Sequence, residues 1–205
     1  MAKLTLVSVS NAKLDKDGIV SINMPPVITC PGAGACKAYC YAQVGNQNFP
    51  GPKNFRLRAF DLFKTDPQKF KQTLKEEIHR TGRKIVRWHD SGDIVNLAYL
   101  KIMVSIANHF PDTKFYTYTK SHKIVQKFGY ENLPNNLKII QSYGGKNDNL
   151  INTKYPFAKI FTKEEDIPEG FTNCSNSDYP AATTATQIAI IAHGSRKSKF
   201  ITEAT

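Results

Sequence analysis

The chain has 205 residues, of which 40% are hydrophobic and 22% charged. This composition excludes a disordered protein, and we expect one globular domain over residues 1–205. The 28 Lys and Arg exceed the 17 Asp and Glu, so the formal net charge is +11. Such an excess favours an anionic small molecule, a nucleotide or a nucleic acid as partner. A generally lysine-rich composition explains the charge as well, because the lysines are spread along the chain.

No apolar run approaches the about 20 residues that span a bilayer, so no membrane partner is expected. Residues 1–18 turn polar quickly and lack the continuous apolar segment of a secretory signal. We therefore expect a cytoplasmic location. In that reducing compartment disulfides are rare, and clustered cysteines more often hold metal.

The N-terminal part predicts a β-hairpin and, further on, a pair of helices. Residues 3–9 and 18–23 are short β-like runs around a turn-forming segment, so residues 1–24 are expected to form a β extension. Residues 55–82 indicate two helices, the second with Asp66 as its N-cap.

Strands and helices then alternate. Strands are expected at residues 84–90, 114–120, 137–143, 157–162 and 187–193, and helices at 97–110 and 122–129. Such alternation predicts βαβ units around a parallel sheet. With the segment before Cys30 there are about six parallel strands, and the later crossovers are short. We therefore expect an α/β fold in which residues 25–195 form a partial (β/α) TIM-like barrel.

Three of the four cysteines lie in one short segment, with the spacing C-x5-C-x3-C at Cys30, Cys36 and Cys40. Zinc sites usually present close C-x2-C pairs, so this spacing favours a 4Fe–4S cluster, whose irons each take one thiolate. The glycines of the first spacer are expected to let the backbone approach the inorganic sulfides. Cys174 either binds the fourth iron or leaves that iron open to a small molecule. Zinc, or three reduced thiols packed for bulk, remain alternatives.

Polar residues follow the predicted strands, at the edge where parallel sheets bind ligands. The residues expected to hold a cofactor are Ser91, Gly92, Asp93, Gln141 and Ser142. The residues expected to line the pocket as catalytic groups are His89, Asp90, Lys120 and His193. Lys120 suits a carboxylate or phosphate, and His89 or His193 could transfer a proton. The alternative for Ser91 and Asp93 is that they cap the helix that follows.

The order CPGAGACKAYCYA, RWHDSGDI, FYTYTKS and AHG resembles the phage gene-product-88 family, which is similar to radical S-adenosylmethionine enzymes with a partial TIM barrel. The resemblance implies that Cys30, Cys36 and Cys40 bind a 4Fe–4S cluster. It also implies that residues 91–93 help to hold the amine of S-adenosylmethionine. The usual spacing in those enzymes is C-x3-C-x2-C, and their GGE-like element is SGD here. If Cys174 bound the fourth iron, S-adenosylmethionine could not chelate it.

The sequence therefore predicts a phage-encoded iron–sulfur protein of the host cytoplasm that acts on a nucleotide or nucleic acid, with S-adenosylmethionine as a candidate cofactor. Two alternatives stay open. One is a non-catalytic, metal-stabilised binding module for nucleic acid or a host protein, and the other is a cluster-dependent hydrolase or lyase. Whether the protein is an enzyme is not decided by the sequence.

Overall fold

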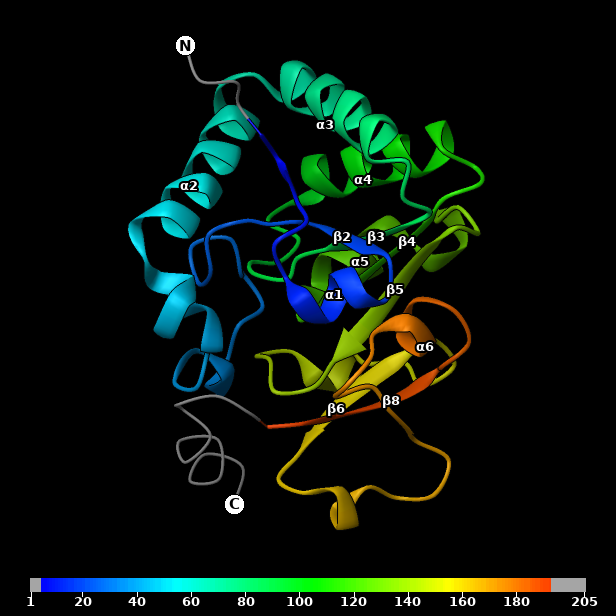
Figure 1. Cartoon of the computed structure of the whole chain (residues 1–205). Helices are drawn as coiled ribbons and strands as arrows, with labels where there is room; N and C mark the ends of the chain where they lie inside the picture. The colour runs from blue at the N-terminus through cyan, green and yellow to red at the C-terminus, as the bar shows by residue number, and fades with distance from the viewer. Residues whose placement is uncertain (1–4, 193–205) are drawn as a thin grey trace.

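One open sheet of eight strands organises the computed structural model, which describes residues 5–192 (Figure 1). In chain order the strands are β1 (Val7–Ser8), β2 (Ile19–Ile22), β3 (Ile85–Trp88), β4 (Lys114–Thr119), β5 (Leu137–Ser142), β6 (Phe157–Phe161), β7 (Thr172–Asn173) and β8 (Gln187–Ile191). Their order in the sheet is β1-β2-β3-β4-β5-β6-β8-β7, and every neighbouring pair except β1 and β2 is parallel. The predicted α/β fold with a mostly parallel sheet is confirmed.

The predicted pairing at the N-terminus is also confirmed, because Val7 of β1 lies opposite Ile22 of antiparallel β2. The connection differs from the expected turn. It contains the short helix α1 (Ala12–Lys16), whose N-cap Asn11 accepts hydrogen bonds from two backbone N–H groups through its side chain. Gly18, with φ +70°, then turns the chain into β2.

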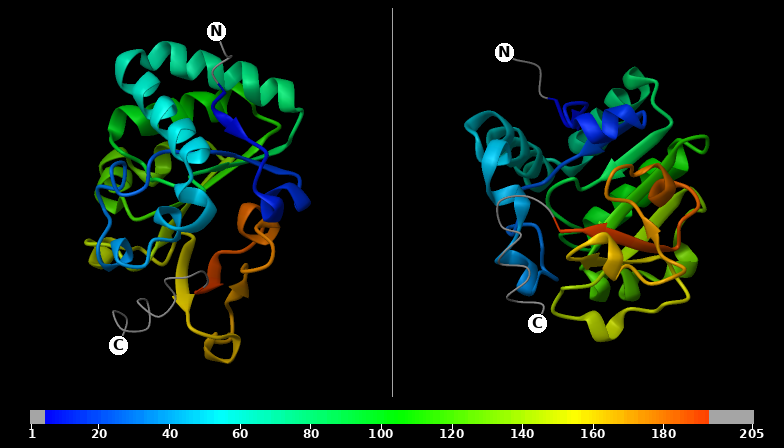
Figure 2. Two further views of the ribbon diagram at one scale, coloured as in Figure 1. Left: turned by 60° about the vertical axis from the view of Figure 1, so that its left-hand side comes forward. Right: turned by 60° about the horizontal axis from the view of Figure 1, so that its bottom comes forward.

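The sheet is not closed, so a TIM barrel is not formed. Its edges are β1 and β7, and no pairing joins them within residues 5–192. Strands β2 to β6 are neighbours in chain order, whereas β8 lies between β6 and β7 (Figure 2). Right-handed crossovers between consecutive neighbours place their helices on one face of the sheet.

The helices that cover this face are α2 (Pro50–Thr65), α3 (Pro67–Thr81), α4 (Leu97–His109) and α5 (His122–Phe128). The Asp66 side chain accepts from the Lys69 N–H at 2.9 Å, so the predicted N-cap of α3 is confirmed. Side chains that alternate along the strands, such as Val86 and Trp88, pack under these helices in the larger core cluster. None of the helices in residues 5–192 is long and apolar enough to cross a bilayer.

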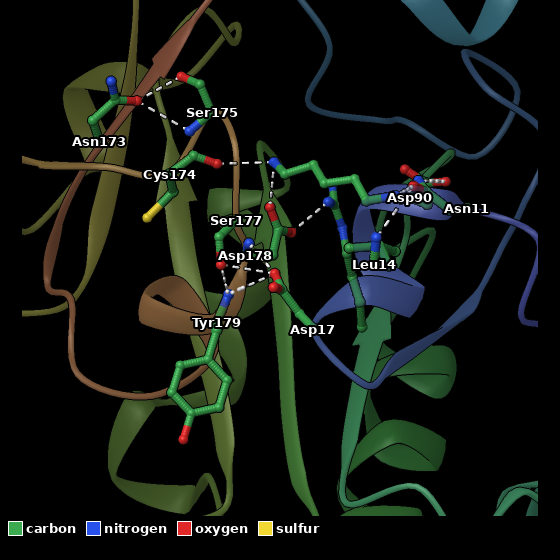
Figure 3. Close-up of polar contacts among 12 residues, drawn as sticks. Asn11, Leu14, Asp17, Asp90, Asn173, Cys174, Ser175, Ser177, Asp178 and Tyr179 are labelled. Atoms are coloured by element: carbon green, nitrogen blue, oxygen red, sulfur yellow. Dashed lines mark hydrogen bonds and ion pairs between the residues drawn. The ribbon is translucent and has the colours of Figure 1, made fainter.

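The opposite face carries a smaller core under α1 and α6 (Tyr179–Ala182), and it contains a buried ion cluster. The Asp178 carboxylate lies 2.6 Å from an Arg87 guanidinium nitrogen and 2.7 Å from the Lys13 ammonium, and it accepts a hydrogen bond from the Tyr116 hydroxyl at 2.8 Å. Figure 3 shows how Asp17 holds the backbone before α6, where its carboxylate accepts from the Asp178 N–H at 2.7 Å. These contacts join the N-terminal segment to the end of the sheet.

Candidate ligand and metal site

A cavity of about 230 Å³ lies at the carboxyl edge of the sheet. It is lined by the loop after β2 and by residues at the ends of β3, β4, β5, β6 and β8. The predicted site residues among its lining residues are Cys30, Cys36, Cys40, His89, Asp90, Ser91, Gly92, Asp93, Lys120 and Ser142. Segments far apart in sequence thus meet where parallel sheets bind ligands.

Three predicted site residues are not among those that line the cavity. Cys174 is fully buried in the smaller core. In Figure 3 only its backbone carbonyl oxygen makes a hydrogen bond, which it accepts from Lys13 Nζ at 2.8 Å. Gln141 is fully buried and exchanges two hydrogen bonds of 2.8 Å with the Asn152 backbone. His193 lies outside the described residues.

The three clustered thiols are half-buried. Burial and, to a smaller extent, the Asp93 carboxylate together raise the pKa of the Cys30 thiol to about 12. Burial also raises the pKa of Cys36, while the Lys120 ammonium opposes the rise. Cys30 and Cys36 are therefore protonated at neutral pH unless a cation binds them. Within residues 5–192, no three His, Cys, Asp or Glu side chains stand together so as to hold a metal ion.

The glycines of the cysteine loop have a packing role that the sequence prediction did not include. A Cβ atom on Gly32 would lie 1.8 Å from the Lys120 carbonyl oxygen, and one on Gly34 would lie 2.9 Å from the Gly145 carbonyl carbon. The Gly32 carbonyl also accepts from the Lys146 N–H at 2.9 Å. These glycines let the loop lie directly against the segments after β4 and β5, which fixes the cysteines over the cavity.

Ser91 and Gly92 hold the loop after β2 in place, the first through hydrogen bonds and the second through close packing. The Ser91 hydroxyl donates to the Met24 carbonyl at 2.8 Å, and the Met24 N–H donates to the Ser91 carbonyl at 2.9 Å. Gly92 has φ +88°, and a Cβ atom there would lie 2.6 Å from Met24 Cβ. Both residues therefore attach the cysteine loop to β3 through contacts within the protein.

Asp93 joins the ends of two strands. Its buried carboxylate accepts from the Thr119 hydroxyl at 2.5 Å, the Ile94 N–H at 2.7 Å and the Lys120 N–H at 2.9 Å. Burial raises the pKa of Asp93, and these hydrogen bonds partly oppose the rise. Neither Ser91 nor Asp93 caps the next helix, because the N-cap of α4 is Asn96.

His89 is a buried neutral group. Its Nδ1 lies 3.0 Å from the Thr117 hydroxyl and its Nε2 lies 3.2 Å from the Tyr99 hydroxyl, so both ring nitrogens have partners inside the protein. Burial and, to a smaller extent, the charge of Arg87 together lower the pKa of His89 to about 3. The backbone at His89 has φ +66°, a left-handed conformation that is uncommon for a residue with a side chain. Proton transfer by His89 stays a prediction.

Two polar groups of the cavity wall were missed by the sequence prediction. Arg87 and Tyr118 lie on neighbouring strands and both line the cavity, with the Arg87 guanidinium carbon 5.1 Å from the centre of the Tyr118 ring. Alternation along β4 is the signal that could have found Tyr118, because it puts Tyr116 and Tyr118 on one face of the sheet. Lys120, predicted from its place at the strand end, donates to the Ser142 hydroxyl at 2.6 Å.

The fold and the site together define an open α/β protein with a cysteine-lined cavity at the carboxyl edge of its sheet. The sequence model of the family described as Gene product 88 matches residues 5–204. The chain therefore belongs to the Gene product 88 family, a family of phage proteins. No curated protein and no solved structure matches it.

Proposed function

We propose that Cys30, Cys36 and Cys40 hold a 4Fe–4S cluster at the wall of the cavity, with the fourth iron facing the cavity. The observation that carries this proposal is that these three thiols line one cavity while Cys174 does not. A site with three cysteines has one iron free to bind a small molecule.

The spacing of the cysteines along the chain favours a cluster over a single zinc ion. Zinc sites usually present close C-x2-C pairs, whereas the spacing here is C-x5-C-x3-C. The irons of a cluster each take one thiolate. Lys120 favours the thiolate of Cys36 electrostatically, and the close packing at Gly32 and Gly34 holds the loop in place.

The cluster would supply electron transfer or a Lewis-acidic iron when bound. The neighbour-by-neighbour order of β2 to β6 is compatible with a partial (β/α) barrel, the fold on which the proposed likeness to radical S-adenosylmethionine enzymes rests. In this chain Ser91 and Asp93 already bond within the protein, so Lys120 and Ser142 are the better candidates to meet a cofactor or substrate. A hydrolase or lyase reaction at the same iron would use the same residues.

Metal analysis of anaerobically purified protein tests the proposal. We expect a coloured protein that contains iron and acid-labile sulfide in equal amounts. Cys30→Ala, Cys36→Ala and Cys40→Ala should each lose most of the iron, because each removes one thiolate ligand. A colourless protein that contains zinc in place of iron would instead support the metal-stabilised binding module.

A further inference from the structure

Lys120 is a cation of the cavity wall whose hydrogen-bonding capacity is not used up. An ammonium group has three donors, and one of them is directed to the Ser142 hydroxyl. The ion pairs found within residues 5–192 give Lys120 no carboxylate partner. Asp90 and Asp93 also line the cavity, but neither forms one of these ion pairs, so the Lys120 ammonium can bind an anion from outside the protein.

Tyr118 is a second residue of the cavity wall whose hydrogen-bonding capacity is not used within the described part of the chain. Its hydroxyl is buried and has no hydrogen-bond partner in the described part of the chain. Tyr116, two residues earlier on the same face of β4, donates its hydroxyl to Asp178 at 2.8 Å. Because a buried hydroxyl without a partner is costly, the Tyr118 hydroxyl indicates a polar atom that a ligand supplies.

The rest of the cavity is largely apolar. Residues on β6 and β8 supply aliphatic side chains, namely Ala158, Ile160, Ile190 and Ile191. Its volume of about 230 Å³ is below the usual range of ligand pockets, about 300–1,000 Å³. Such a space suits a small molecule with a short apolar body better than a stretch of nucleic acid.

We propose that this cavity binds a small organic acid, a carboxylate or phosphate monoester on a mainly apolar body. Its anionic group would lie on Lys120 and Ser142, and a polar atom at its other end would accept or donate a hydrogen bond at Tyr118. This names the substrate class of the proposed function. A reaction of such an acid at the cluster depends on the proposed function, whereas binding of the acid to the cavity does not.

Ligand titrations of the full chain followed by NMR test the proposal. The probes are 4-hydroxyphenylacetate, 4-nitrophenyl phosphate and the neutral 4-hydroxyphenylacetamide. We expect at least one acid to bind saturably, and the amide to bind at least about tenfold more weakly than the carboxylate. Lys120→Met should remove this preference, because it keeps the chain length and removes the charge. Which acid binds more tightly decides between carboxylate and phosphate.

Tyr118→Phe and Tyr116→Phe form a matched pair for the second contact. Tyr118→Phe should weaken acid binding while leaving the Tm of the ligand-free protein unchanged or higher, because its hydroxyl has no partner to lose. Tyr116→Phe should lower the Tm and leave acid binding unchanged, since it removes a hydrogen bond to Asp178 and does not line the cavity.

Three results would overturn the inference: no saturable binding of either acid, equal binding of acid and amide, or a drop in Tm for Tyr118→Phe as large as that for Tyr116→Phe. The first of these results includes the case in which a single-stranded oligonucleotide binds in place of the acids and Lys120→Met does not affect its binding. Iron analysis of the same samples separates the two proposals. Iron without acid binding contradicts only this inference, and acid binding without iron contradicts only the cluster.

Discussion

Gly32→Ala is expected to destabilise the protein by about 3 kcal/mol and to remove most of the iron of the proposed cluster. The added Cβ would lie 1.8 Å from the Lys120 carbonyl oxygen, which is backbone and cannot rotate away. The cysteine loop must therefore move off the ends of β4 and β5, and the cavity loses one wall. Urea unfolding measures the change in the free energy of unfolding, and metal analysis measures the iron.

Gly51→Ala is the matched control, because a Cβ at Gly51 meets nothing within 4 Å. Gly51 lies in the first turn of α2, where alanine is the better helix former, so this change should be neutral or stabilise by up to about 1 kcal/mol. If Gly32→Ala behaved like Gly51→Ala, the close contact of the cysteine loop would not be what holds the site together.

Asp178→Asn should cost about 3–5 kcal/mol, because it leaves the largely buried Arg87 guanidinium without its counter-charge. Burial by itself raises the pKa of Asp178, but Arg87 and Lys13 more than offset this, and the pKa lies below its usual value. A carboxyl whose pKa is depressed in the folded state stabilises the fold above its ordinary pKa of about 3.9, and this contribution is lost as the pH falls below that value.

Urea unfolding at pH 7 and at successively lower pH checks both parts of this expectation. The difference between wild type and Asp178→Asn should be large at pH 7 and should shrink as the pH falls from about 4. Asp61→Asn is the control, because its pair with Lys64 is exposed at 3.6 Å and should contribute less than about 1 kcal/mol. A difference that stays constant with pH would show that the carboxylate charge of Asp178 does not stabilise the fold.

Much of the fold could be predicted from the sequence because its signals are local. The alternation of apolar strands with helices gave β3, α4, β4, α5, β5, β6 and β8 to within a few residues. Asp66, as a cap at a helix boundary, is read from neighbouring residues in the same way. Whether the open sheet curves into a partial barrel could not be predicted, because curvature depends on contacts between strands far apart in sequence. The short elements α1, α6 and β7 were missed because a few residues carry little periodicity.

The site was predicted in part for the same reason. Residues at strand ends were placed at the correct edge, so Lys120 and the three clustered cysteines line one cavity as expected. The functions of single side chains could not be read, because they depend on partners from other segments. Ser91 donates a hydrogen bond to the Met24 carbonyl, and Asp93 accepts one at the end of β4. No local sequence pattern predicts these partners. The partners that bury His89 come from β4 and α4 in the same way.

Iron analysis of Cys174→Ala beside Cys36→Ala tests the central claim most directly. Both changes remove one thiol, but Cys36 lines the cavity and Cys174 is buried in the smaller core. We predict that anaerobically prepared Cys174→Ala keeps the iron and sulfide content of the wild type, whereas Cys36→Ala loses most of both. Loss of the iron from Cys174→Ala, or iron retained in Cys36→Ala, would contradict a three-cysteine cluster with an open iron.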